Sequence, residues 1–135
     1  MKTLINSEDA PVAVGPYSPC LSVGEWIFLS GQGGFDPTTG KMISDDIAEQ
    51  TAQTFRNIEV LLEAAGASLD SVVSCLVHLT DLSQFGAFNA IYEKKFTGTK
   101  PVRTTVRADL VAGMLVEITA VARTSKQATR EPMDG

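Results

Sequence analysis

The stretch DDIAEQTAQTFRNIEVLLEAAG, residues 45–66, decides how the rest of the chain is arranged. Its apolar residues recur at steps of three and four, as expected for a helix that buries one side. Asp46 and Glu49 have the spacing of a capping box at the start of such a helix, and Gly66 is a residue that commonly ends one. We therefore predict a helix whose core face carries Ile47, Thr51, Phe55, Ile58, Leu62 and Ala65.

Short segments rich in β-branched and aromatic residues flank this helix and predict strands. They cover residues 21–31, as two strands around Gly24, and residues 71–80, 102–108 and 114–122. Aromatic residues at helical spacing predict a second helix, which ends at Gly98 and carries Phe85, Phe88, Tyr92 and Phe96. The order of strands, helix, strand, helix and strands predicts an α+β fold, in which a single sheet has both helices on one face.

The chain has the length of one domain and the composition of an ordinary globular protein. Its 135 residues are 44% apolar and 20% charged. A domain of this size buries about two thirds of the surface that its unfolded chain exposes. We expect a single domain over residues 1–123 and a polar, flexible tail over residues 124–135.

Charge and cysteine content argue against several classes of protein. The net charge is −5 and the 11 basic residues are scattered, whereas proteins that bind nucleic acid cluster theirs. No segment is apolar enough for a signal peptide or a membrane span, so we expect a cytoplasmic protein without a membrane partner. Cys20 and Cys75 lack the spacing of a metal pair, and we interpret them as buried free thiols rather than a disulfide.

Alternation along the expected strands separates the two faces of the sheet. On the last strand the even-numbered residues 116–122 are all apolar and are expected beneath the helices, so Glu117 points to the opposite face. The same reasoning places beneath the helices Ile27, Leu29, Val73, Cys75, Val77, Leu79, Val102, Thr104 and Val106. It assigns to the opposite face Trp26, Phe28, Ser30, Leu76, His78, Arg103, Thr105, Arg107, Leu115, Glu117, Thr119 and Val121. A face of this apolar character ordinarily forms an interface, so we expect a closed homo-oligomer that packs these faces together.

Arg103 and Glu117 have the clearest chemistry on the second face. The Arg side chain offers a planar fork of donors that matches a carboxylate. A carboxylate such as Glu117 can act as a general base on water. With Ser30 and the glycines of SGQGG, residues 30–34, they would outline a pocket for a small polar acid.

Simpler interpretations stay open for these residues. Arg103 and Glu117 could form an ion pair at a subunit interface, and we interpret His78 as an ordinary interface residue rather than an acid or base. The SGQGG segment fits a turn better than an anion-binding loop, because its spacing matches neither common nucleotide-binding pattern. Tyr17 and Asn89 could be an ordinary loop aromatic and a polar helix residue.

Several separated motifs occur in an order that is similar to one protein family. They are GPYS (15–18), FLSGQ (28–32), FNAIYEKKF (88–96), KPVRTTV (100–106) and VEITAVA (116–122). With these motifs the chain resembles the reactive intermediate deaminase family, also called RidA or YjgF-like, over essentially its whole length.

The resemblance implies a chorismate-mutase-like α+β fold with a single mixed sheet, assembled as a homotrimer with its active sites between subunits. It implies hydrolysis of reactive 2-imino or 2-enamino acids, such as those derived from 2-aminoacrylate, to 2-keto acids and ammonia. This is the activity of a metal-independent 2-iminobutanoate/2-iminopropanoate deaminase, which needs no cofactor. By position, Arg103 would hold the substrate carboxylate and Glu117 would orient or activate the attacking water. The remaining pocket residues implied by the resemblance are Tyr17, Ser30, Gly31, Asn89 and the backbone of Thr105.

Other functions fit the same residues. A deaminase specific to one catabolic pathway would use the same groups on a different imine. A non-catalytic trimer could bind small acids in the same cleft, as a regulatory or chaperone-like protein. A ribonuclease is less well supported, because metal-free RNA cleavage ordinarily needs two acid–base groups near a phosphate, and this acidic chain has a single His.

Overall fold

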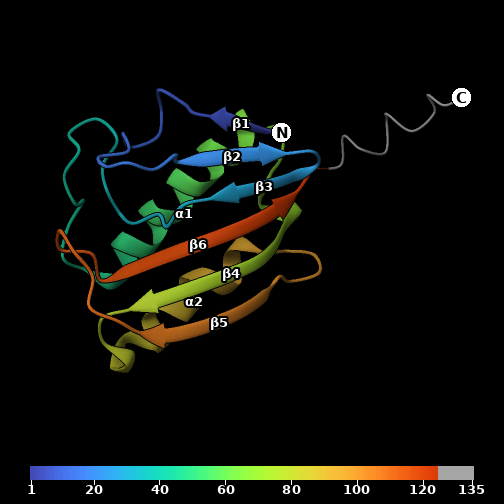
Figure 1. Cartoon of the computed structure of the whole chain (residues 1–135). Helices are drawn as coiled ribbons and strands as arrows, with labels where there is room; N and C mark the ends of the chain where they lie inside the picture. The colour runs from blue at the N-terminus through green and yellow to red at the C-terminus, as the bar shows by residue number, and fades with distance from the viewer. Residues whose placement is uncertain (125–135) are drawn as a thin grey trace, which may run out of the picture.

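The computed structural model of the protein describes residues 1–124, which form one six-stranded sheet and two α-helices (Figure 1). The strands lie in the order β1-β2-β3-β6-β4-β5, and every neighbouring pair is antiparallel except β4 and β5. The elements are β1 (Lys2–Ile5), β2 (Cys20–Val23), β3 (Trp26–Leu29), α1 (Ile47–Ala64), the 3-10 helix η1 (Leu69–Ser71), β4 (Val72–Leu79), the 3-10 helix η2 (Leu82–Gln84), α2 (Phe85–Lys95), β5 (Val102–Arg107) and β6 (Val116–Arg123). The predicted α+β fold with a single mixed sheet is therefore confirmed.

Both α-helices lie on one face of the sheet, and no other element of residues 1–124 covers the opposite face (Figure 1). The chain runs from β4 through α2 to β5, and such a helical connection is what parallel neighbours require. The last strand, β6, inserts between β3 and β4. The side chains of β6 therefore lie near the centre of the sheet.

Helix α1 begins and ends where the sequence predicts. The Asp46 side chain accepts a hydrogen bond from the backbone N–H of Glu49 at 2.9 Å. Gly66 follows the helix with φ of 83°, a conformation that glycine adopts without strain. Strand β1 was not predicted, because four residues that include Lys and Thr show too little apolar alternation.

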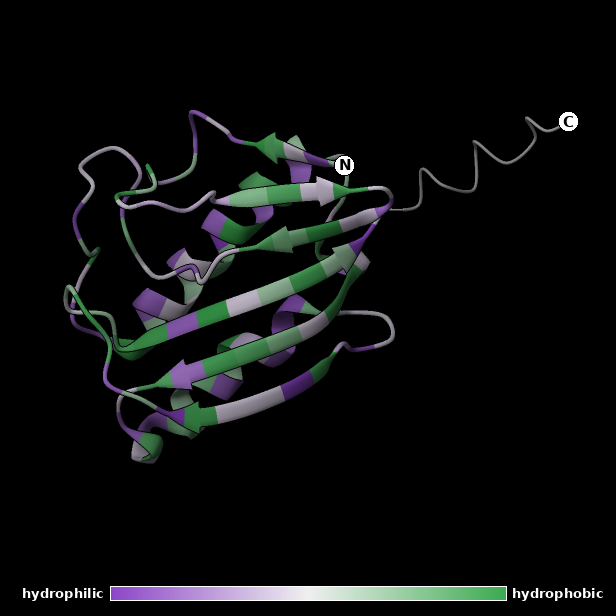
Figure 2. Ribbon diagram, in the orientation of Figure 1, coloured by the Kyte–Doolittle hydropathy of each residue, from purple (hydrophilic) through white to green (hydrophobic). Residues whose placement is uncertain are grey.

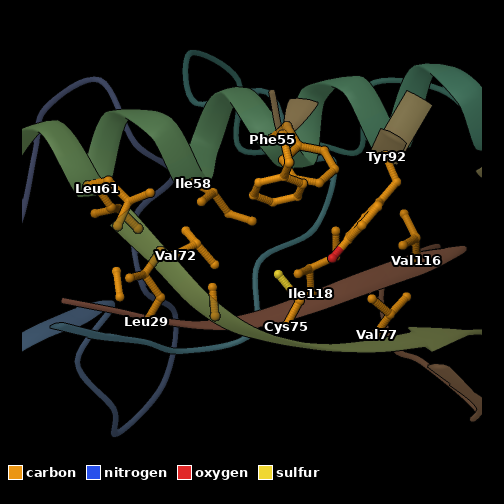
Figure 3. Packing of buried hydrophobic residues seen from close by; sticks show 14 of the residues in the cluster. Leu29, Phe55, Ile58, Leu61, Val72, Cys75, Val77, Tyr92, Val116 and Ile118 are labelled. Carbon is orange, nitrogen blue, oxygen red and sulfur yellow. The ribbon is translucent and has the colours of Figure 1, made fainter. Parts of the chain in front are cut away.

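The core lies between the helices and the sheet (Figure 3). Phe55, Ile58 and Leu61 point from α1 toward the strands, where Val77 is fully buried. The Phe55 and Tyr92 rings are 5.8 Å apart in an edge-to-face arrangement, so α1 and α2 are joined by aromatic packing. These contacts account for the apolar faces that the helical spacing predicted.

A β-bulge at the start of β4 corrects one predicted side-chain orientation. Val72 pairs with Ala122 and Ser74 pairs with Val121, so Val73 is the extra residue between two pairs. The bulge leaves Val73 40% exposed and buries Val72 instead. The prediction that Val73 lies beneath the helices is therefore wrong, while Cys75, Val77 and Leu79 beyond the bulge are buried as predicted.

Strand β5 has the opposite orientation to the predicted one. Its parallel register pairs Cys75 with Arg103 and Val77 with Thr105, and paired residues share a face. Arg103, Thr105 and Arg107 therefore lie on the helix side, and Val102, Thr104 and Val106 lie on the opposite face. The alternation of apolar residues predicted the wrong face because β5 is an edge strand. Its helix side is only partly covered, and its valines face the uncovered side, where Val102 is 70% exposed.

The uncovered face of the sheet is apolar over a wide area. Figure 2 shows apolar segments on neighbouring strands, with both helices behind the sheet. Its exposed large side chains include Trp26, Phe28, Leu76, Val102 and Val106. The corrected orientation of β5 therefore makes this face more apolar than predicted, which strengthens the expectation of a partner over it.

The C-terminal end of the described chain bears on the predicted boundary between the domain and the tail. Thr124, placed in the tail by the sequence, is buried, and its backbone N–H donates to the Glu25 carbonyl at 2.8 Å. The remainder of the expected tail, 125–135, lies outside the described residues.

Within residues 1–124, neither α-helix has the length and apolar character needed to cross a bilayer.

Candidate active site

A cavity of about 700 Å³ lies beside β6. Its walls come from the loops at residues 11–19, 30–40 and 111–114, and from one side chain of β6. Four of the site residues expected from the sequence line it, namely Tyr17, Ser30, Gly31 and Glu117. The structure thus brings a phenol, a hydroxyl and a carboxylate to one cavity.

The Glu117 carboxylate packs directly against Gly31. A Cβ atom at Gly31 would lie 2.6 Å from Cδ of Glu117 and 2.7 Å from its Oε2, which is closer than non-bonded atoms approach. The other oxygen, Oε1, lies 3.8 Å from Nδ1 of His78. Glycine at position 31 is therefore what allows the carboxylate to occupy this position.

The SGQGG segment is not the turn that the sequence suggested. Gln32 forms a bridge to β6, donating to the Ile118 carbonyl at 2.9 Å and accepting from its N–H at 3.0 Å. A Cβ at Gly33 would lie 2.5 Å from Met114 Sδ, and one at Gly34 would lie 2.9 Å from the Cα of Gln50. The glycines therefore permit close packing of an extended segment against β6 and α1.

Two buried amides of α1 support the cavity walls, and the sequence analysis missed both. Gln50 donates to the carbonyls of Ser44 and Gly113, and its own Oε1 accepts from the Leu115 N–H at 2.8 Å. Asn57 donates to the carbonyls of Gly33 and Phe35, each at 2.9 Å. The available signal was their spacing, because two amides seven residues apart share a side of a helix that otherwise buries apolar residues.

Arg103 belongs to a second group, on the helix side of β5. One guanidinium nitrogen donates to the Asn89 side-chain oxygen at 2.7 Å. The guanidinium carbon lies 4.6 Å from the centre of the Tyr92 ring and 5.3 Å from that of Phe85. Among residues 1–124 no carboxylate lies within 4 Å of Arg103, and the side chain is exposed. Residues of α2 therefore hold the Arg103 guanidinium in place, and its remaining N–H groups are available to bind an acid.

Buried polar groups lie beside Arg103. The hydroxyl oxygens of Tyr92 and Thr105 are buried and have no hydrogen-bond partner among residues 1–124. Burial raises the pKa of the Tyr92 phenol above its ordinary value, Cys75 raises it further, and Arg103 lowers it. Burial also raises the pKa of the Cys75 thiol, against the opposing effects of Tyr92 and Arg103. Both groups are therefore neutral at physiological pH.

The two groups of candidate residues are not brought together within one chain. Glu117 points to the uncovered face and Arg103 to the helix face, and β4 separates their strands. The expectation that Arg103 shares a face with Ser30 and Glu117 is therefore wrong. For the same reason, an Arg103–Glu117 ion pair does not form within the chain.

The described part of the chain contains neither a metal-binding cluster nor a disulfide. Residues 1–124 contain no cluster of three or more His, Cys, Asp or Glu side chains that could hold a metal ion. Cys20 and Cys75 are both buried and unpaired, which confirms their interpretation as free thiols.

A mixed six-stranded sheet with both helices on one face, and a cavity beside β6 lined by a carboxylate, define an α+β protein with a candidate ligand site. The family model described as Endoribonuclease L-PSP matches residues 7–124. The chain therefore belongs to this family, which is also known as the YjgF/RidA family.

Named relatives agree with this assignment. A RutC family protein of Pyrococcus horikoshii is 41% identical over 123 residues, covering 90% of this chain and 98% of the relative. The 2-iminobutanoate/2-iminopropanoate deaminase of Homo sapiens is 37% identical over 123 residues, which is 90% of each chain. The crystal structure of RidA from an Antarctic Psychrobacter superposes with a TM-score of 0.86 at 38% identity, covering 90% of this chain and 98% of that one. The resemblance read from the motifs is confirmed.

Proposed function

We propose that the protein is a metal-independent hydrolytic deaminase, which converts reactive 2-imino and 2-enamino acids to 2-keto acids and ammonia. One observation carries the proposal: one chain has a guanidinium fork with no acid partner among residues 1–124 and a cavity with a carboxylate, on opposite faces of its sheet. Relatives named 2-iminobutanoate/2-iminopropanoate deaminase support the reaction.

Arg103 binds the substrate carboxylate in this proposal. Asn89 occupies one nitrogen of the guanidinium, and the rings of Phe85 and Tyr92 lie against it, so the side chain is oriented before a ligand arrives. A planar fork fixed in this way matches the two oxygens of a carboxylate. Thr105, two residues along the same face of β5, offers its backbone to the same ligand.

Glu117 directs the water that attacks the imine carbon. A protonated imine is already an activated electrophile, so the protein needs to position a water molecule and accept its proton. Ser30 and Tyr17 provide hydroxyl groups in the same cavity. Attack gives a carbinolamine, which releases ammonia and leaves the 2-keto acid.

We further propose that the working form is a homotrimer, in which one subunit supplies the Arg103 group and its neighbour supplies the Glu117 group. The uncovered apolar face offers the surface for such an assembly. RNA is a poorer candidate substrate, because phosphate binding relies on clustered basic residues and this chain has a net charge of −5.

The test is the rate of keto-acid formation from an imine generated in situ by a dehydratase. Added protein is expected to accelerate it, and Arg103→Ala to lower kcat/KM by about a hundredfold or more, since a charge-assisted fork is lost. Absence of acceleration, or an unchanged rate in Arg103→Ala, would contradict the proposal. Tight binding of a 2-keto acid without turnover of any imine would instead support a non-catalytic binding protein.

A further inference from the structure

His78 is the single histidine of the chain, and it lies beside the Glu117 carboxylate. The two residues are register partners on β4 and β6, and both point to the uncovered face. Nδ1 of His78 is 3.8 Å from Oε1 of Glu117. This nitrogen is buried and has no hydrogen-bond partner among residues 1–124, whereas buried polar atoms ordinarily have one.

The surroundings of His78 leave Glu117 as its single charged neighbour in the described chain. Across the sheet on the other side its register partner is Val106 of β5. Along the chain its neighbours at a spacing of two are Leu76 of β4 and Thr80, which follows the end of β4, and neither carries a charge. No other ion pair of His78 occurs within 4 Å in residues 1–124. A movement of about 1 Å would bring Nδ1 and Oε1 to hydrogen-bond distance.

The carboxylate of Glu117 therefore has two distinct sides. Oε2 lies against Gly31, in the wall of the cavity, where a ligand and water have access. Oε1 faces His78, whose Nδ1 atom is closed to solvent. A proton on Nδ1 can thus reach the cavity through Glu117 and not through direct contact with a ligand.

We propose that His78 is a positioning residue for Glu117, which fixes the carboxylate from behind and holds a proton for it during the reaction. The inference rests on the proposed deaminase function and adds a second group to its proton transfers. It revises the interpretation of His78 as an ordinary interface residue.

The reaction itself shows why a second group is useful. Water attacks C2 of the iminium and forms the C–O bond, the C=N electron pair moves to nitrogen, and one water proton passes to Glu117. The nitrogen then takes up a proton, the C–N bond breaks with its electron pair leaving on ammonia, and the remaining hydroxyl proton must be accepted as the C=O bond forms. Oxygen thus gives up two protons, which end on nitrogen as ammonium. If His78 holds the first proton and returns it through Glu117 to the nitrogen, the carboxylate is charged again when the hydroxyl proton must be accepted.

The pairing can be measured without any enzyme assay. Because the untagged chain has one histidine, the ring C–H signals in its NMR spectrum belong to His78. Replacing Glu117 by Gln removes the carboxylate that lies 3.8 Å from Nδ1, so at a fixed pH these ring signals are expected to move from their wild-type positions. The control is Glu25→Gln, which removes the same charge from the carboxylate paired with Arg123 at the β2–β3 turn. Ring signals at the same positions in Glu117→Gln and the wild type would overturn the pairing.

The kinetic test compares two substitutions at His78. His78→Leu removes both hydrogen bonding and proton uptake, and we expect kcat to fall about tenfold with KM within twofold of the wild type. His78→Asn keeps an amide near the Nδ1 position but cannot take up a proton, so its kcat should remain as low as that of His78→Leu, with KM again near the wild-type value.

Leu76→Ala provides the control for general disturbance of the uncovered face, since Leu76 pairs with Thr119 rather than Glu117. The mass of the assembly is measured for every variant by light scattering. Wild-type kcat in His78→Leu, with assembly intact, would overturn the proton-holding role. If the wild type turns over no imine, the deaminase proposal fails, and the NMR comparison of Glu117→Gln with the wild type still decides whether His78 and Glu117 act as a pair.

Discussion

Arg103 and Glu117 point to opposite faces of one sheet, on strands that β4 separates. Arg103 contacts Asn89, Tyr92 and Phe85 of the helix layer, whereas Glu117 faces the cavity beside Gly31. In a 2-imino acid the carboxylate carbon is bonded directly to C2. A single chain therefore cannot hold the carboxylate on Arg103 while Glu117 directs water to C2.

The first prediction concerns complementation between two inactive variants. Arg103→Ala and Glu117→Gln should each be nearly inactive, but a co-expressed 1:1 mixture should regain activity, because some sites join an intact Arg103 to an intact Glu117. Random assembly gives about a quarter of the sites in this state if each site lies between two subunits. The measurement is the rate of keto-acid formation per subunit.

A site completed within one subunit would give a different result. The mixed assemblies would then be as inactive as the separate variants, and the shared-site proposal would fail. Mixing the purified variants without exchange of subunits serves as the control, since each remains a homo-oligomer.

The second prediction concerns Gly31. In Gly31→Ala the new Cβ would lie 2.6 Å from Cδ of Glu117, so the carboxylate has to move. Since displacement of a reacting group by about 1 Å has large effects on rate, kcat/KM should fall at least about tenfold. Gly86→Ala is the matched control, because a Cβ at this position in α2 meets no atom within 4 Å. It should keep full activity and raise the free energy of unfolding by up to about 1 kcal/mol. Equal activities in the two variants would contradict the role of Gly31.

The sequence predicted the elements that local patterns determine. Asp46 and Glu49 located the start of α1, and the apolar alternation of β6 correctly assigned Glu117 to the uncovered face. The faces of β5 could not be obtained in this way, because the valines of an edge strand need not point to the core of the subunit. The pairing of β5 with β4, which decides its orientation, is a contact between distant segments.

The supporting residues of the site were harder still to predict. Val73 was misassigned because a bulge leaves no trace in the apolar pattern of β4. The side chains of Gln50 and Asn57 each bind at least one backbone group more than 20 residues away, so no local spacing indicates what they support. His78 gained its significance only from its register with Glu117.

The third prediction is a loss of stability at alkaline pH that depends on Cys20. Burial raises the pKa of the Cys20 thiol from 9.0 to about 11. Above pH 9 the unfolded chain ionises this thiol and the folded chain does not, so the stability present below pH 9 is lost as the pH rises toward 11. The slope from this group is about 1.4 kcal/mol per pH unit. Urea denaturation at several pH values should show a shallower decline for Cys20→Ala, and parallel curves would contradict the prediction.

The last prediction separates two roles of Tyr92. Its ring lies 4.6 Å below the Arg103 guanidinium, and its hydroxyl has no hydrogen-bond partner among residues 1–124. Tyr92→Phe keeps the ring, so calorimetry should find the Kd for a 2-keto acid unchanged and the free energy of unfolding within about 1 kcal/mol of the wild type. Tyr92→Leu removes a cation–π contact of about 0.5–2 kcal/mol, and the Kd should rise about threefold to tenfold.

Loss of packing in the core must be distinguished from loss of the Arg103 contact. Phe96→Leu is the control, because Phe96 packs in the same aromatic cluster, 5.0 Å from the Tyr92 ring, and makes no cation–π contact with Arg103 among residues 1–124. Both Leu variants should lose stability, but Tyr92→Leu alone should weaken acid binding. If the two variants weaken it equally, Tyr92 acts through the core, and Asn89 is left as the group that orients the guanidinium.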